Sequence, residues 1–197
     1  MNSTIRKAER MSLDDFEELL LERPEDEKWE LIEGVLVKGM VGARLEHHVI
    51  ISNIDYALHD HFKRNGVPCR VFRESFFLKK REDDLAALPD VMVRCGKIEP
   101  GATSVDDPIV LFEVVSPGSE GKDRLIKRIA YQRLLSLQHY VLVERDRPFI
   151  DHYIRTPEGW RGEVPLETLD AVLRLAAIDF EMPVAEIYRD VIASPAA

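Results

Sequence analysis

The chain has 197 residues, which is enough for one well-buried domain and too few for two domains of ordinary size. Hydrophobic residues make up 45% and charged residues 32%, and no apolar run approaches the roughly 18 residues of a membrane-spanning helix. The 36 acidic and 27 basic residues give a net charge of −9, so any nucleic-acid-binding surface must be a local patch or be assembled by oligomerisation.

The N-terminal residues lack the apolar core of a secretory signal, and the two cysteines, Cys69 and Cys95, form neither a metal-type nor a redox-type pair. We therefore expect a cytoplasmic protein with reduced cysteines and no membrane partner. The chain has no internal repeat and no linker. We expect one domain over residues 12–190, with short tails at residues 1–11 and 191–197.

The first third of the chain predicts a helix, a hairpin and a second helix. Ser12 has the position of a helix cap, and the helix that follows it ends at Pro24. Residues 29–37 read as two short strands that turn at Gly34. Residues 44–65 carry an apolar stripe at helical spacing, which the Asn-Gly pair after it terminates.

The rest of the chain alternates strands with one long helix and one short one. The predicted strands cover residues 69–79, 88–94, 108–115 and 140–143, followed by hairpin-like segments at 149–154 and around Trp160. The predicted helices cover residues 122–137 and a short stretch from Pro183 to about Asp190. This order indicates an α/β fold in the broad sense, a mixed α+β sheet flanked by helices in a single domain.

Glu113 interrupts the apolar run of residues 109–115, which otherwise resembles a central strand covered on both faces. A buried, unpaired carboxylate costs several kcal/mol, so a cation, a metal or a proton usually compensates it. A structural ion pair at the strand end is the alternative interpretation.

Asp90 and Lys127 are two further charged residues that we expect near Glu113. Asp90 enters the strand before Glu113, on the face of Met92, although a lone Asp after a proline is more often a turn residue. On the following helix, five residues at spacings of three and four share one face: Asp123, Lys127, Ala130, Tyr131 and Leu134. This stripe should pack against the sheet, and its aspartate and lysine would place opposite charges near Glu113. A lysine lying along the apolar surface is the alternative.

Four other residues are accessory candidates. Glu33, at a strand end, could join the carboxylates, and Arg124 is either solvated or phosphate-facing. Tyr131 shares the stripe of Lys127. His47 lies on the apolar side of its helix, where a histidine is more often a hydrogen-bonded core residue than a ligand or base.

These residue types suit a magnesium site. Mg²⁺ prefers oxygen ligands and keeps several waters, so two or three carboxylates can hold it. The cation lowers the pKa of a bound water and offsets charge on a phosphate, and a nearby lysine stabilises the same charge. The turn at residues 116–119, before a helix N-terminus, could offer backbone N–H groups to a phosphate.

The ordered set resembles the Uma2 family (DUF820), a bacterial group of the PD-(D/E)XK restriction-endonuclease-like superfamily. The resemblance covers residues 12–188, and its matching segments are residues 29–34, 47–54, 88–91, 111–117, 123–131 and 173–187. It implies a restriction-endonuclease-like core and a Mg²⁺-dependent endonuclease, with Mn²⁺ as a substitute. The implied partners are DNA as substrate and a second copy of the chain in a homodimer.

The resemblance also implies residue roles. Asp90 and Glu113 match the metal-binding carboxylates, and Glu33 matches an additional N-terminal acid. The superfamily's lysine normally lies two residues after the second acid, where this chain has Val115. Lys127 matches a lysine that the family has moved to the next helix.

Two other functions remain open from the sequence. One is a non-catalytic module that keeps the fold and binds nucleic acid or protein, which the acidic net charge favours. The other is a phosphohydrolase acting on a small substrate at residues 116–123. The sequence contains neither a Walker-type lysine loop nor a His-Glu-x-x-His zinc helix, so no motif supports that second alternative.

Overall fold

The structure is a computed structural model, and it describes residues 10–40, 42–115 and 121–192. The bounds of its helices and strands, in chain order, are α1 (Leu13–Leu20), β1 (Glu27–Ile32), β2 (Val35–Met40), α2 (Leu45–Asn65), β3 (Cys69–Arg73), β4 (Phe77–Lys80), β5 (Leu85–Ala87), β6 (Val91–Cys95), β7 (Ser104–Val105), β8 (Val110–Val115), α3 (Gly121–Gln132), β9 (His139–Glu144), β10 (Ile150–Thr156), β11 (Gly159–Gly162), β12 (Val172–Leu175), β13 (Phe180–Pro183) and α4 (Val184–Ile187).

The strands form three sheets rather than the single sheet that the sequence suggested. The largest has the order β11-β10-β9-β8-β6-β3, in which β8 and β9 are parallel and the other neighbours antiparallel. A second sheet has the order β2-β1-β5-β4-β7, and β12 pairs with β13 in a third. The predicted class, a mixed α/β fold with helices flanking a sheet, is confirmed.

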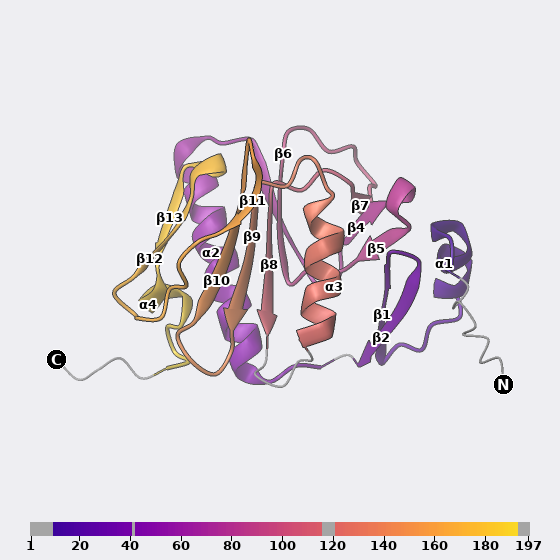
Figure 1. Cartoon of the computed structure of the whole chain (residues 1–197), viewed down its shortest axis with the longest axis horizontal. Coiled ribbons are helices and arrows are strands. Elements are labelled where there is room, and N and C mark those ends of the chain that lie inside the picture. The colour runs from indigo at the N-terminus through magenta and orange to yellow at the C-terminus, as the bar shows by residue number, and fades with distance from the viewer. Residues whose placement is uncertain (1–9, 41, 116–120, 193–197) are drawn as a thin grey trace.

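The six-stranded sheet is covered on both faces, as the apolar sequence of β8 predicts. Val110, Phe112 and Val114 belong to the core that contains the buried side of α2, whereas Leu111 packs with residues of α3. Figure 1 shows α3 beside β8, with the β1–β2 hairpin on the other side of α3. Helix α3 therefore lies between the two larger sheets, and its buried face can contact both.

Several local predictions hold. Ser12 caps α1 and accepts a hydrogen bond from the Asp15 backbone N–H. Gly66 ends α2 in a left-handed conformation with φ of 63°, which a glycine adopts without steric cost. The hairpin of β1 and β2 turns at Glu33 and Gly34, both at positive φ.

Other boundaries differ from the sequence prediction. The strand expected over residues 69–79 is two strands in different sheets, because the chain turns after Arg73. The helix expected to reach residue 137 ends at Gln132. There the Arg155 guanidinium donates to the backbone carbonyls of Gln132, Leu134 and Leu137, so a distant strand holds the chain in a non-helical path.

The expectation of reduced cysteines is wrong in this structure. Cys69 and Cys95 lie directly opposite each other on β3 and β6 and are joined by a disulfide. They are 26 residues apart in sequence, and only strand pairing brings them together. Among the described residues, none of the helices has the length and apolar character needed to cross a membrane.

Candidate metal centre

Asp90 and Glu113 lie opposite each other on neighbouring strands. Val91 of β6 pairs with Phe112 of β8, so one step further along this antiparallel register brings Asp90 beside Glu113. An Oδ2 atom of Asp90 accepts a 2.7 Å hydrogen bond from the Val114 backbone N–H. By strand alternation Glu113 shares the face of Leu111, which α3 covers, and Asp90 lies just before β6, at the strand end that His47 of α2 reaches.

The Glu113 carboxylate is buried and is held by two side chains of α3. Tyr131 donates a 2.9 Å hydrogen bond to its Oε1, and the Lys127 Nζ lies 3.2 Å from the same oxygen. Burial raises the pKa of Glu113 to about 7, even though the charge of Lys127 opposes that change. The carboxyl group is therefore poised to exchange a proton near neutral pH.

Lys127 bridges Glu113 to Glu30, a residue of β1 in the second sheet. The Lys127 Nζ lies 3.0 Å from an oxygen of Glu30, whose Oε1 also accepts a 2.8 Å hydrogen bond from the Leu88 N–H. Burial alone would favour the neutral amine, but the charges of the two glutamates outweigh it and raise the pKa of Lys127 above its usual value. Lys127 therefore stays a cation.

On its other side, Asp90 faces His47 of α2 and Glu74 of the turn between β3 and β4. The Nε2 atom of His47 lies 3.5 Å from Oδ1 of Asp90 and 3.6 Å from Oε1 of Glu74. Burial favours the neutral acid, but contact with His47 and with the backbone N–H holds the pKa of Asp90 below its usual range. His47 therefore faces two carboxylates rather than an apolar core.

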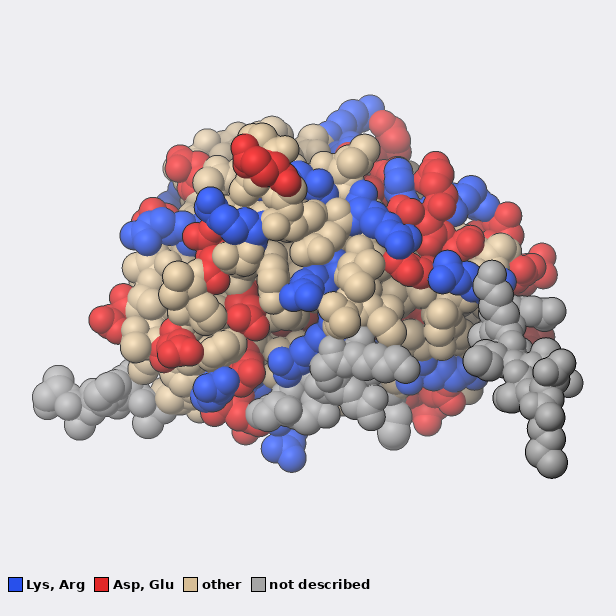
Figure 2. Space-filling model, viewed as in Figure 1, with Lys and Arg blue, Asp and Glu red and all other residues tan. Residues whose placement is uncertain are grey.

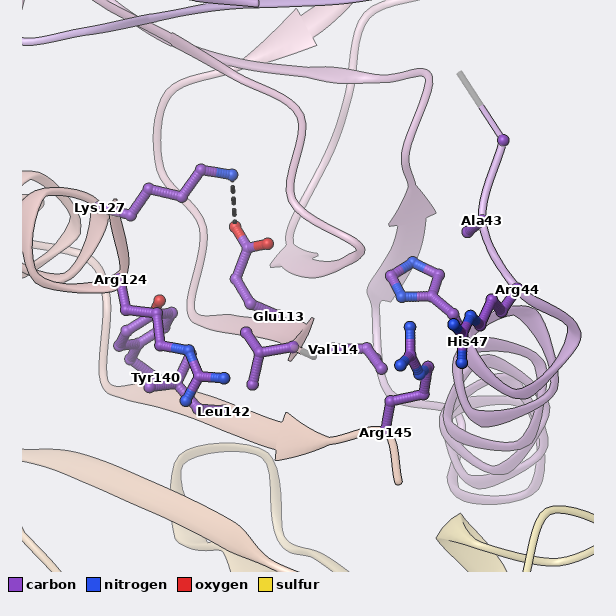
Figure 3. A pocket seen from close by; sticks show the side chains of 12 residues that line it. Ala43, Arg44, His47, Glu113, Val114, Arg124, Lys127, Tyr140, Leu142 and Arg145 are labelled. Carbon is purple, nitrogen blue, oxygen red and sulfur yellow. Dashed lines mark hydrogen bonds and ion pairs between the residues drawn. The ribbon is translucent and has the colours of Figure 1, made fainter. Parts of the chain in front are cut away.

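A pocket of about 430 Å³ opens beside Glu113 and Lys127. Its wall also includes His47 and the basic residues Arg44, Arg124 and Arg145. Figure 3 shows Lys127 and Glu113 on one side of this space, with His47 and Arg44 on α2 across from them. The pocket combines a carboxylate with several cations, an arrangement that suits a phosphate group beside a bound metal ion.

Asp90 and Glu113 have the oxygen donors that a divalent cation requires. The protein fixes one oxygen of each: the Val114 N–H holds Oδ2 of Asp90, while Tyr131 and Lys127 hold Oε1 of Glu113. The second oxygen of each is then available as a ligand. Carboxylate oxygens are the ligands that Mg²⁺ and Mn²⁺ accept in proteins.

Comparison with known proteins assigns the chain to a family. Residues 13–185 match the family model described as "Uma2: Putative restriction endonuclease". The chain belongs to the Uma2 family. This confirms the resemblance that the sequence motifs indicated, over nearly the whole domain.

Two similar proteins match most of this chain. "Uncharacterized protein slr1290" of Synechocystis sp. is 28% identical over 174 residues, which are 88% of this chain and 90% of that protein. A crystal structure of "a putative nuclease belonging to DUF820" from Anabaena variabilis covers 92% of this chain and 99% of its own, with a TM-score of 0.71 and 18% identity. The Uma2 protein therefore shares the fold of that structure, and family and fold together indicate a restriction-endonuclease-like protein.

Glu30, to which the sequence analysis gave no role, contacts Lys127, whereas the candidate Glu33 does not. Glu33 lies in the turn after β1 and pairs with Arg133 of the segment after α3 at 3.0 Å, whereas Glu30 contacts Lys127. Glu30 stands between Trp29 and Leu31, both buried. It thus shows the same signal as Glu113, an acid among buried-type residues, and that signal could have identified it.

The remaining sequence candidates are placed as follows. Arg124 lines the pocket and lies 3.9 Å from an oxygen of Glu144. The Asp123 side chain and residues 116–120 lie outside the described part of the chain. Glu74, which no sequence pattern marked, joins His47 and Asp90 only because of the turn between β3 and β4.

Proposed function

We propose that this Uma2 protein is a metal-dependent endonuclease that hydrolyses DNA phosphodiester bonds. The observation that carries the proposal is the position of Asp90 and Glu113 at adjacent ends of the neighbouring strands β6 and β8, with Lys127 against Glu113. The family membership supports a nuclease, and the basic pocket wall offers a place for a phosphate.

Each residue has a role in this proposal. Asp90 and Glu113 hold Mg²⁺, or Mn²⁺ in its place, and a bound cation lowers the pKa of a water and offsets charge on the scissile phosphate. Lys127 donates to the phosphate from the wall of the pocket. Tyr131 and Glu30 are positioning residues, since they contact Glu113 and Lys127 respectively.

A plasmid assay tests the proposal. Purified protein is incubated with supercoiled DNA and Mg²⁺ or Mn²⁺, with EDTA as the metal-free control. We expect nicking that Glu113→Gln and Asp90→Asn reduce by about 100-fold or more, since each removes a charged metal ligand. Glu163→Gln, a change in an exposed carboxylate, is the matched control and should leave the rate unchanged. Cleavage that survives Glu113→Gln would refute the assignment.

A second candidate function rests on the ion pairs of Lys127. This cation lies between Glu30 and Glu113 and compensates part of their negative charge without a metal. The chain could then be a non-catalytic module that binds nucleic acid or protein. Calorimetric titration with Mn²⁺ separates the two: a bound ion that Glu113→Gln removes supports the nuclease, and a titration that Glu113→Gln leaves unchanged supports the module.

We propose DNA as the substrate and a homodimer as the acting form, with residues 12–190 as its single domain. Figure 2 shows Lys and Arg interspersed with Asp and Glu on the face drawn, without a continuous basic surface there. A dimer would double the local basic patch that one chain provides. Sedimentation velocity at several protein concentrations tests the dimer, and a monomer that still cleaves DNA contradicts it.

A further inference from the structure

His47, Glu74 and Asp90 converge on one point at the end of the six-stranded sheet. They come from the first turn of α2, from the turn between β3 and β4, and from the residue before β6. One donor atom from each lies within 4.8 Å of the other two. The side chains of His47 and Asp90 are 16% and 7% exposed, so packing sets their positions, whereas the Glu74 side chain is 37% exposed.

The separations within this cluster suit ligands of one ion better than a hydrogen-bond network. The His47 nitrogen is 3.5 Å and 3.6 Å from the two carboxylate oxygens, beyond the roughly 2.7–3.2 Å of a directed N–H···O bond. A cation with bonds of about 2.0–2.2 Å separates neighbouring ligand atoms by about 3 Å and opposite ones by about 4 Å. The two His47 distances fall within that range, and the separation of the Glu74 and Asp90 oxygens is at most 4.8 Å.

From this geometry we propose that His47, Glu74 and Asp90 form a second divalent-cation site, selective for Mn²⁺ and similar transition ions over Mg²⁺. The site shares Asp90 with the proposed nuclease centre but does not depend on Glu113 or on DNA cleavage. It faces a different pocket, of about 640 Å³, which all three residues line. That pocket gives a hydrated ion a path to the site.

The donor set decides the class of ion. An imidazole nitrogen with two carboxylate oxygens is a ligand set that Mn²⁺, Co²⁺ and Zn²⁺ accept, whereas Mg²⁺ prefers oxygen ligands alone. Asp90 is already oriented for this role, because the Val114 N–H holds its Oδ2 and turns its Oδ1 toward His47. Lys28, which also lines this pocket, donates to the backbone carbonyl of Leu88.

Mn²⁺ is the probe for the test, because electron paramagnetic resonance reports both its affinity and its ligands. We titrate wild-type protein with Mn²⁺ and record pulsed spectra for coupling to a ¹⁴N nucleus. We expect such coupling in wild type. His47→Gln should abolish it and weaken Mn²⁺ binding at least about tenfold, as loss of a ligand does. Glu74→Gln should weaken binding similarly and keep the coupling.

His48→Gln is the matched control, since His48 is the neighbouring, exposed histidine that lines the same pocket. It should leave the coupling and affinity unchanged. Absence of ¹⁴N coupling in wild type, or coupling that survives His47→Gln, overturns the site. Circular dichroism checks that each variant folds. If His47→Gln fails to fold, Glu74→Gln, which changes a turn residue, provides a second test.

Glu113→Gln separates this inference from the proposed function. If Glu113→Gln loses cleavage and keeps ¹⁴N-coupled Mn²⁺, both proposals stand. If no condition gives cleavage but the coupling is present, the second site stands and the nuclease assignment fails. If cleavage requires Glu113 and His47→Gln changes neither Mn²⁺ binding nor the spectrum, the nuclease stands and the second site fails.

Discussion

At the scale of single residues, the charge of Lys127 is tied to that of its two partners. Its amine lies 3.0 Å from Glu30 and 3.2 Å from Glu113, and both carboxylates are almost fully buried. Removing one partner of a buried ion pair leaves an uncompensated charge, which costs more than the pair contributed. The same contacts hold the Glu113 side chain in place, so under the proposed function stability and activity would depend on one set of atoms.

Lys127→Met should therefore lower the free energy of unfolding by about 3 kcal/mol at pH 8. The pKa of Glu113 is raised from 4.5 to about 7, so the folded state holds its proton more tightly than the unfolded state. Lowering the pH from 8 to 5 protonates Glu113 and should relieve part of the loss. Urea denaturation at both pH values measures this.

Arg133→Met is the matched control for that experiment. Its partner is Glu33, and the Arg133 side chain is 52% exposed, so this ion pair should contribute less than about 0.5 kcal/mol. A Lys127→Met protein as stable as wild type at pH 8 would show that the two glutamates are not charged together in the fold.

At the scale of elements, β9 and β10 are joined by a buried pair of histidines. His139 Nε2 accepts a hydrogen bond from the Ala177 N–H, so its proton is on Nδ1, which donates to Nε2 of His152 at 2.9 Å. Both rings must be neutral for this arrangement. Burial lowers the pKa of each to about 4.

The histidine pair predicts a loss of stability in mild acid. The unfolded histidines bind protons from about pH 6.5 downward, but the folded pair does so only near pH 4, so the contribution is complete above 6.5 and decreases below it. One histidine gives about 1.4 kcal/mol per pH unit, or about 2 kcal/mol between pH 6.5 and 5.

Denaturant titrations at pH 7 and pH 5 measure this loss. His152→Gln should reduce the pH dependence, because a glutamine oxygen can accept from His139 and does not titrate in this range. His48→Gln, at an exposed position, should leave it unchanged. Equal stability of wild type at the two pH values would contradict the assignment of neutral rings.

The hairpin that carries Glu30 depends on Gly34. This glycine has φ of +76°, and a Cβ there would lie 2.8 Å from the Cβ of Arg10. Gly34→Ala should destabilise the protein by about 1–2 kcal/mol from the left-handed conformation alone. Gly39→Ala is the control, since its added Cβ meets only the Lys28 carbonyl at 3.6 Å. Thermal unfolding that responds equally to both changes would contradict this view of the turn.

At the scale of the whole molecule, a protein with a net charge of −9 must bind a polyanion through local contacts. The pocket beside Glu113 supplies them: Arg44, Arg124 and Arg145 line it together with Lys127. Few phosphates can be neutralised in so small an area. DNA binding should therefore be weak at physiological salt and should fall as salt rises.

Arg44→Gln should weaken DNA binding and reduce the slope of log affinity against log salt concentration by about 1, as loss of one phosphate contact does. Arg44 is exposed and lies at the N-terminal cap of α2, beside the pocket. Fluorescence anisotropy with labelled duplex DNA in Ca²⁺, chosen to limit turnover, measures the slope. Arg174→Gln, in the β12–β13 pair, should change neither the affinity nor the salt slope. Equal effects of Arg44→Gln and Arg174→Gln would mean that DNA binding is not confined to the pocket.

The sequence by itself determined the elements that carry the site and the face that each residue occupies. Glu113 within an apolar strand, Asp90 at the start of another, and Lys127 and Tyr131 at helical spacing were all identified, because alternation and helical periodicity are local properties of the chain. These rules placed Glu113 on the face that α3 covers, where Tyr131 and Lys127 contact it, whereas the contacts of Asp90 are with the Val114 N–H and with His47 of α2.

Only the tertiary structure decided which residues of other elements reach that face. Glu30 rather than Glu33 contacts Lys127 because β1 belongs to a separate sheet that packs beside α3. Glu74 meets His47 and Asp90 because β3 ends early and turns there, and the cysteines pair because β3 lies against β6. Such contacts join residues far apart in sequence, and local sequence patterns do not determine which strands will pair.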